Sequence, residues 1–174
     1  MSNNWMGPSS RGEGRYATAA VCLKGDVSTP DLETQGARLS KFCSNCGAEV
    51  ITACPSCNAP IRGFYIPPGV SGVGGIFKSL ASFCHDCGKP YPWMIEKLAA
   101  AKGLADELEN LSSEDREKLK TAIDDVITSG PRAEAGAARI KRIVGRAGTA
   151  AGQALWKIIV DIASEAAKKI MLGG

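Results

Sequence analysis

The sequence is poor in histidine, aromatic residues and long apolar runs; the first and last of these shortages exclude classes of function, and the second limits the hydrophobic core. His85 is the one His among 174 residues. A Ser-His-Asp triad, or a catalytic zinc held by several His, would therefore have only His85 to build on. Its neighbours Asp86 and Cys87 do not give the His-x-Glu pair that a deaminase zinc site requires. Aromatic residues make up 6% of the chain, which predicts a modest hydrophobic core.

No segment approaches the roughly 18 consecutive apolar residues that a membrane-spanning helix needs. The N-terminal residues 1–14 are polar and Gly-rich and lack the apolar core of a signal peptide. With 44% hydrophobic and 22% charged residues, the composition is typical of a folded protein and excludes wholesale disorder. We therefore expect a soluble, cytoplasmic protein without a transmembrane segment.

The composition changes sharply near Trp93. Residues 1–92 hold all seven Cys and eight of the nine Pro, whereas residues 93–174 are rich in Ala, Leu, Ile, Lys and Glu. Frequent Pro and Gly favour short strands and tight turns, and the second composition favours helices. We predict a small α+β protein with a flexible tail at 1–14, a Cys-rich domain of β-hairpins at 15–92 and a C-terminal helical bundle of about four helices at 93–174.

Apolar spacing and capping residues predict the four helices of the second half. They span about 94–110, from Ser112 or Ser113 to the Gly130–Pro131 pair, 134–146 and 151–171. The last of these is apolar almost all round, so it needs a large partner surface. A central position in the bundle is the simplest interpretation, and a homo-oligomer interface is the alternative. Asp161 and Glu165 argue against a membrane surface.

Three Cys-x-x-Cys pairs lie close together in the first half: Cys43–Cys46, Cys54–Cys57 and Cys84–Cys87. In a reducing compartment such pairs are metal ligands more often than disulfides, and the odd number of Cys agrees. Two pairs close one tetrahedral zinc site. The Gly or Asn after each second Cys tolerates the left-handed backbone of such a turn. A thioredoxin-like redox motif would need a helix after the pair, and Pro55 and Pro60 prevent one there.

Three pairs supply six of the eight ligands that two zinc ions need, so the seventh Cys decides the second site. Cys22 lies in a pattern of strand, turn and strand, which brings Asp26 near it, and Asp oxygen is a less usual zinc ligand. We predict two Zn²⁺ ions: site 1 with Cys22, Asp26, Cys43 and Cys46, and site 2 with Cys54, Cys57, Cys84 and Cys87.

Other arrangements of the ligands stay open at this point. The segment from Cys43 to Cys57 contains two pairs and can hold one zinc ion alone, or the three pairs can interleave. His85 is an alternative eighth ligand, although a residue between the two Cys of a knuckle usually points outward. The cysteine pattern therefore predicts a double zinc ribbon at 15–92 more firmly than it assigns each ligand.

Three stretches carry a resemblance to a known family: residues 16–22 (YATAAVC), 54–63 (CPSCNAPIRG) and 83–93 (FCHDCGKPYPW). With residues 111–125 and 159–163 of the helical half, they resemble an uncharacterised bacterial zinc-ribbon family, classed as a domain of unknown function, over most of the chain. In that family the first turn reads Cys-x-Asn-Gly-His, and its His would complete a zinc site. Lys24 and Asp26 replace the Asn and the His here, which implies weaker binding at site 1 or its loss. The resemblance implies a zinc ribbon and no established activity.

The charges are unevenly distributed along the chain. Residues 1–92 carry a net charge of +2, residues 93–130 of −4 and residues 131–174 of +5. The basic cluster of the last third can contact nucleic-acid phosphates or face the acidic second helix inside the bundle; it comprises Arg132, Arg139, Lys141, Arg142 and Arg146. A pI near 8.5 is low for a dedicated nucleic-acid-binding protein.

These patterns favour a non-enzymatic zinc-binding protein that acts as an interaction or scaffold module. The ribbon would be held by structural zinc, and the helical half would associate with itself or dock a protein partner. The first alternative is a nucleic-acid-binding zinc-ribbon protein that uses the basic Arg139–Arg146 face. The second is a thiol redox sensor at Cys22, which requires an accessible thiolate. An enzyme is not expected, because closed four-ligand zinc sites leave no position for a substrate.

Overall fold

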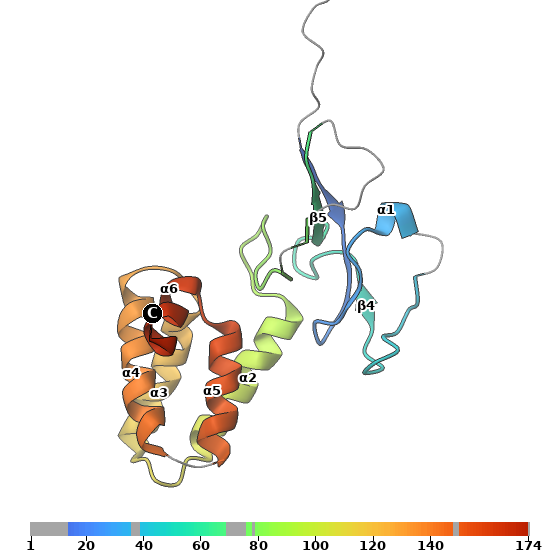
Figure 1. Cartoon of the computed structure of the whole chain (residues 1–174). Coiled ribbons are helices and arrows are strands. Elements are labelled where there is room, and N and C mark those ends of the chain that lie inside the picture. The colour runs from blue at the N-terminus through green and yellow to red at the C-terminus, as the bar shows by residue number, and fades with distance from the viewer. Residues whose placement is uncertain (1–13, 36–38, 69–75, 78, 148–149, 174) are drawn as a thin grey trace, which may run out of the picture. The chain divides into compact units, whose positions relative to one another are not determined.

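The computed structural model describes residues 14–35, 39–68, 76–77, 79–147 and 150–173. The chain divides into two compact units, Met1–Pro92 and Trp93–Gly174, called here the ribbon unit and the helical unit (Figure 1). Short antiparallel strands in the first and helices in the second confirm the α+β class. The flexible tail predicted at 1–14 lies, apart from Gly14, outside the described residues.

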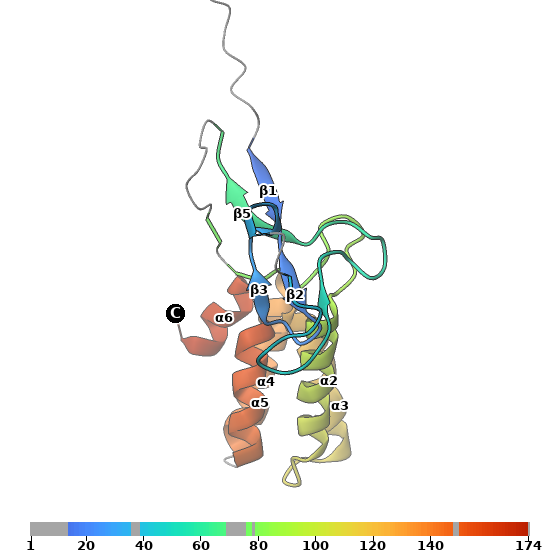
Figure 2. The same cartoon turned by 90° about the vertical axis from the view of Figure 1, so that its right-hand side faces the viewer.

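The ribbon unit contains two small antiparallel sheets and one short helix. The first sheet pairs β1 (Arg15–Thr18) with β5 (Arg62–Ile66), and Figure 2 shows these strands side by side. The second sheet has the order β3–β2–β4, with β2 (Ala20–Cys22) at its centre between β3 (Val27–Thr29) and β4 (Val50–Ile51). The helix α1 (Leu32–Gln35) follows β3. Strands of two to five residues pair little backbone, so other interactions must hold this unit together.

A close backbone approach ties the second sheet to the first. Phe64 N–H donates to the Pro30 carbonyl oxygen at 2.9 Å. A Cβ atom at the neighbouring Gly63 would collide with that same carbonyl oxygen. Glycine is therefore required where β5 passes the segment after β3. The side chains buried around this point are small or aliphatic: Ala17, Ala19, Ala20, Val21 and Ile61.

The helical unit contains five helices among the described residues, where the sequence predicts about four. They are α2 (Pro92–Asp106), α3 (Ser113–Val126), α4 (Pro131–Ala147), α5 (Ala150–Ile162) and α6 (Glu165–Leu172). Ser112 caps α3 as expected, because its side chain accepts from Asp115 N–H at 3.1 Å. Pro131 begins α4 three residues before the predicted start, since a first-turn residue needs no N–H donor.

The prediction of one helix from 151 to 171 is wrong. The helix ends at Ile162, and Ser164 adopts an extended conformation and caps α6 through a hydrogen bond from Ala167 N–H at 3.4 Å. Ser164 N–H donates to the Val126 carbonyl oxygen at the end of α3, at 2.8 Å. That tertiary hydrogen bond takes the Ser164 N–H away from the helix and stabilises the break.

Helices α3 and α4 form the densest packing of the helical unit. Gly136 lets them approach, since a Cβ atom there would lie 2.9 Å from Asp125 Cβ and 3.0 Å from the Ala122 carbonyl oxygen. The ion pairs Lys102–Asp124, at 2.7 Å, and Lys97–Asp161 join α2 to α3 and to α5. The completely buried aliphatic side chains of this unit are Leu119, Ile123, Val126, Ile140, Leu155 and Ile159.

Candidate metal centres

The three Cys-x-x-Cys segments fold into the same turn. In each, the N–H of the first Cys donates at 2.8 Å to the carbonyl oxygen five residues later, in Ala48, Ala59 and Lys89. The residue after the second Cys donates back to the first Cys carbonyl oxygen, at 2.8–3.0 Å. That residue has a left-handed φ of 70° in Gly47, 62° in Asn58 and 70° in Gly88. The left-handed backbone predicted after each pair is confirmed.

A fourth turn of different construction carries the seventh Cys. Cys22 N–H donates to the Asp26 carbonyl oxygen, and Gly25 N–H donates to the Cys22 carbonyl oxygen, both at 2.9 Å. Gly25 takes a φ of 95°, and β2 and β3 flank it as strand, turn and strand. Asp26 N–H also donates to Cys22 Sγ at 3.2 Å. The turn thus directs the thiol and the carboxylate of one hairpin to the same side.

These four turns meet in two pairs and form two clusters of four donor atoms, each within 4.8 Å of one another. In site 2, Cys54 Sγ lies 3.8 Å from Cys87 Sγ, and Cys57 Sγ lies 3.6 Å from Cys84 Sγ. In site 1, Cys22 Sγ lies 3.7 Å from Cys46 Sγ. The eight residues singled out from the sequence therefore assemble in the groups expected.

Asp26 completes site 1. Its Oδ2 atom lies 3.6 Å from Cys22 Sγ and 3.5 Å from Cys43 Sγ, and it also accepts a hydrogen bond from Asn45 Nδ2 at 3.4 Å. Asn45 lies between the two Cys of its knuckle, a second contact of Asp26 that the sequence analysis missed. The sequence signal for this contact is the Asn in the Cys-x-Asn-Cys motif, because an amide side chain between the two Cys of a knuckle can reach a ligand from another turn.

The distances within both clusters fit a tetrahedral metal ion. Sulfur atoms about 2.3 Å from a zinc ion at tetrahedral angles lie about 3.8 Å apart, and a zinc-bound carboxylate oxygen lies about 3.5 Å from such a sulfur. Three pairs of sulfur atoms lie 3.6–3.8 Å apart, and Asp26 Oδ2 lies 3.5–3.6 Å from two sulfur atoms. All donor atoms of a cluster lie within 4.8 Å of one another. No disulfide forms among the seven Cys. Each cluster can therefore hold one metal ion.

The electrostatics of site 2 also favour a cation. The N–H groups of Cys87 and Asp86 lower the pKa of Cys84 to about 6. At Cys57, the Ala59 N–H lowers the pKa, but loss of hydration and the neighbouring thiols raise it to about 12. One thiolate therefore forms readily and opposes ionisation of the next, because like charges repel at this distance. A divalent cation is what allows all four thiols to deprotonate.

The electrostatics of site 1 also favour a cation, with one carboxylate in place of a thiol. Hydrogen bonds from the Cys43 and Asn45 side chains lower the pKa of Asp26, so this carboxylate is ionised at neutral pH. At Cys46 the Ala48 N–H lowers the pKa, but loss of hydration and the thiols of Cys22 and Cys43 raise it to about 11. The carboxylate thus supplies one permanent negative charge to the cluster.

The structure groups the donor atoms in one of the arrangements that the sequence left open. The pair at Cys54 and Cys57 meets the pair at Cys84 and Cys87, so residues 43–57 do not form a site alone. His85 is exposed on its knuckle and belongs to neither cluster. Cys22 is completely buried, which does not meet the accessibility that a thiol sensor requires.

The basic cluster of the last third makes contacts within the helical unit. Arg139 lies 3.9 Å from the Asp125 carboxylate on α3, and Lys141 Nζ donates to the Ile170 carbonyl oxygen of α6 at 3.2 Å. The Arg139–Asp125 pair agrees with the interpretation that α4 faces the acidic α3, whereas the Lys141 hydrogen bond joins α4 to α6. Neither contact favours the interpretation that Arg139 and Lys141 bind the phosphate groups of a nucleic acid.

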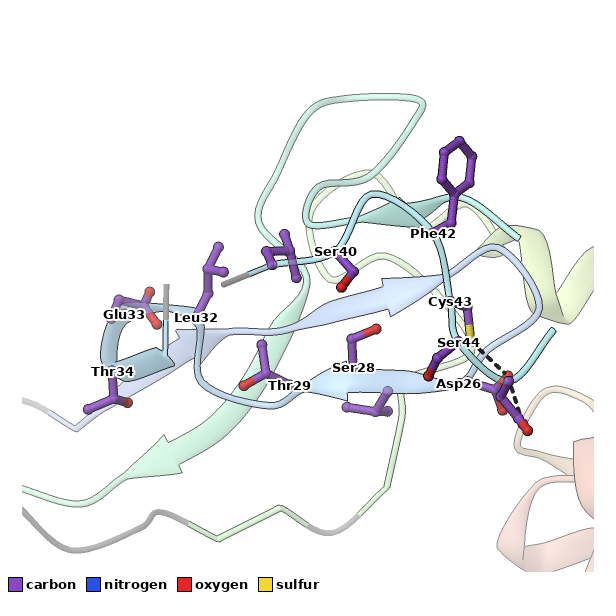
Figure 3. Close-up of a pocket in the computed structure, with 13 residues that line it drawn as sticks. Asp26, Ser28, Thr29, Leu32, Glu33, Thr34, Ser40, Phe42, Cys43 and Ser44 are labelled. Carbon is purple, nitrogen blue, oxygen red and sulfur yellow. Dashed lines mark hydrogen bonds between the residues drawn. The ribbon is translucent and has the colours of Figure 1, made fainter. Parts of the chain in front are cut away.

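An open pocket borders site 1. Asp26 and Cys43 lie at one end of it, and Ser28 and Ser44 lie beside them (Figure 3). Leu32, Glu33 and Thr34 line its far end. Hydroxyl groups thus line much of the space next to the carboxylate ligand, and this space was not expected from the sequence.

Within the described residues, no helix is both long enough and apolar enough to cross a membrane.

Comparison with protein families matches residues 15–171 to DUF2321, described as an uncharacterised protein conserved in bacteria. Because the match covers most of the chain, the protein belongs to this family. The matched residues include most of the ribbon unit and most of the helical unit. Neither the search of curated proteins nor the search of solved structures gives a match.

Proposed function

Since membership of this bacterial family brings no established activity, we propose from the two donor clusters that the protein is a non-enzymatic zinc-binding scaffold. Two zinc ions hold the ribbon unit, and the helical unit docks a protein partner, either a second copy of the chain or another protein. The observation that carries this proposal is the pair of four-donor clusters with tetrahedral spacing.

The donor sets favour zinc among the transition metals. Four thiolates in a tetrahedron accept zinc or iron, whereas three thiolates and one carboxylate are a set that zinc accepts in tetrahedral sites. One metal that satisfies both clusters is the simplest assignment. The ligand turns connect residues far apart in the chain, so the ions act as cross-links of a unit with very short strands.

A structural role suits the closed coordination. Each cluster offers four protein donors, which fills the tetrahedron and leaves no position for a substrate or an activated water. Catalytic zinc usually has three protein ligands and a fourth, open position. This difference supports a scaffold over an enzyme.

Incompletely covered apolar residues on α5 support the docking role of the helical unit. Leu155 and Ile159 are completely buried, but Trp156, Ile158 and Val160 remain partly exposed. Trp156 and Val160 lie one helical turn apart on the same side of α5, and partly exposed apolar side chains in that arrangement are typical of an association surface. A pocket next to Trp156 extends this surface between Val144 and Met171, among other residues of α4, α5 and α6.

Native mass spectrometry of the full chain, purified without chelator, tests both parts in one spectrum. We expect two zinc ions per chain and a species heavier than one chain, either a dimer or a complex with an added partner. Trp156→Glu should remove that association and leave the zinc count at two. Ala154→Glu adds the same charge at an exposed position of α5 outside the pocket and serves as the control. A chain that binds no zinc, or one that Trp156→Glu leaves equally associated, contradicts the corresponding part.

A further inference from the structure

The two clusters differ in one donor atom and in what lies beside it. Site 2 has four sulfur donors, whereas site 1 has three sulfurs and the Asp26 carboxylate. Thiolates are softer donors and bind zinc more strongly than a carboxylate oxygen does. The bond between zinc and Asp26 is therefore the weakest of the eight that the two sites would form.

Asp26 also has a hydrogen-bond partner besides the metal. Its Oδ2 atom, the one that faces the sulfurs of Cys22 and Cys43, already accepts from Asn45 Nδ2 at 3.4 Å. A carboxylate that leaves the metal keeps this hydrogen bond, so its release does not strand a buried charge. Asp26 is only half-buried and retains access to water.

The pocket next to Asp26 gives an incoming ligand room to approach. It borders the cluster at Asp26 and Cys43, with Ser28 and Ser44 beside them (Figure 3). Asn45 also lines it. The serine hydroxyl groups and the Asn45 amide can hydrogen-bond a small polar molecule while it attacks the metal. The Asp26 carboxylate, the Asn45 amide and the pocket thus lie together at one corner of site 1.

We propose that site 1 is an exchangeable zinc site, in which Asp26 is the ligand displaced by a small donor that enters through this pocket, while site 2 is the permanent structural site. This inference rests on the proposed function, because it assumes that both clusters bind zinc. In the exchange step the bond between zinc and Asp26 Oδ2 breaks and a bond from the incoming nitrogen or sulfur donor forms. The ion stays Zn²⁺, and the carboxylate keeps its negative charge.

The test follows zinc release from the full, zinc-loaded chain to the chromogenic chelator pyridylazoresorcinol. We expect two phases, each releasing one zinc ion, and a rate constant for the fast phase at least about tenfold larger than that for the slow phase. The loss of even a supporting hydrogen bond lowers the metal affinity of a site by about tenfold or more, and a weaker donor atom should have at least that effect. Asp26→Cys gives site 1 four thiolates and should slow the fast phase to the rate of the other. Cys57→Asp places a carboxylate at an exposed position of site 2 and should make both phases fast.

Cobalt(II) substitution provides a second readout that does not depend on rates. The ligand-field bands of wild-type protein should be the sum of one four-sulfur site and one site with three sulfurs and one oxygen. In Asp26→Cys both sites should give the four-sulfur spectrum, which also shows that this variant folds around its metal. An unchanged spectrum in this variant would overturn the assignment of Asp26 as a ligand.

The outcomes separate this inference from the proposed function. Two zinc ions released in a single phase, or a fast phase that Asp26→Cys leaves unchanged, would overturn the exchangeable site and leave the zinc scaffold standing. A wild-type chain that binds no zinc would overturn both, whereas one that holds a single zinc ion even after zinc is added would overturn the exchangeable site alone.

Discussion

The ribbon unit and the helical unit bury their side chains in different ways. Among the described residues, Cys22, Cys43, Cys54 and Cys84 are buried in the ribbon unit, beside strands of two to five residues. The helical unit buries Leu119, Ile140 and other aliphatic side chains between helices of 8 to 17 residues. A unit whose buried side chains are so often candidate metal ligands has little apolar area with which to offset chain entropy. The ribbon unit should therefore depend on metal, and the helical unit on its aliphatic core.

Removal of metal should give the largest effect and the clearest separation of the two units. With EDTA at neutral pH the ribbon unit should unfold, since structural zinc contributes about 10–16 kcal/mol in small zinc domains. Hydrogen exchange followed by mass spectrometry should then show loss of protection in residues 15–92 and retained protection in α3 and α4. Added zinc should restore the protection. Equal protection of the ribbon unit with and without metal would contradict its dependence on metal.

A cavity in the helical core should destabilise the helical unit and leave metal binding by the ribbon unit unchanged. Leu119 is completely buried, so Leu119→Ala should lower the free energy of unfolding of the helical unit by about 2–5 kcal/mol. Urea denaturation followed by circular dichroism measures this loss, and native mass spectrometry should still count two zinc ions. Leu172→Ala serves as the control, because Leu172 is 64% exposed and its loss should change stability by less than about 0.5 kcal/mol. A lower zinc count in Leu119→Ala would mean that the two units do not stand independently.

Two glycine substitutions compare the backbones of the two units. Gly63→Ala places a Cβ atom against the Pro30 carbonyl oxygen and should destabilise the ribbon unit by about 1–3 kcal/mol. Gly103→Ala meets open space in α2 and should stabilise the helical unit by up to about 1 kcal/mol, because Ala is the better helix former. Residue-level hydrogen exchange reports both changes. A Gly63→Ala protein with unchanged exchange in β5 would contradict the close approach described here.

The smallest effect concerns the break between α5 and α6. Ser164→Ala removes the cap of α6 and should cost about 1 kcal/mol, measured as a shift of the urea midpoint of the helical unit. Ser113→Ala, within the first turn of α3, leaves the Ser112 cap in place and should shift the midpoint much less. A gain in stability in Ser164→Ala would indicate that the helix prefers to continue through this position.

Local sequence determined the turns of the ribbon unit. Each Cys-x-x-Cys segment followed by Gly or Asn has the left-handed position that its turn requires, because the condition concerns only neighbouring residues. The strand, turn and strand around Gly25 follow for the same reason. Residues 93–174 likewise have the spacing and caps of helices, and α3 begins at the cap that the sequence indicated.

Only the tertiary structure decided between alternative pairings and helix boundaries that local sequence patterns do not distinguish. The sequence allowed three ways to pair the cysteine turns, and the packing of the chain brought Cys54 and Cys57 to Cys84 and Cys87, because long-range contacts set that choice. The break at Ser164 depends on the Val126 carbonyl oxygen, which lies far away in sequence and has no local signature. The pocket beside Asp26 is lined by residues 26–29, 32–34, 39–40 and 42–45, whose spacing does not indicate the space that they enclose. Spacing therefore determined which residues can bind metal, and tertiary packing decided which of them meet and what lies beside them.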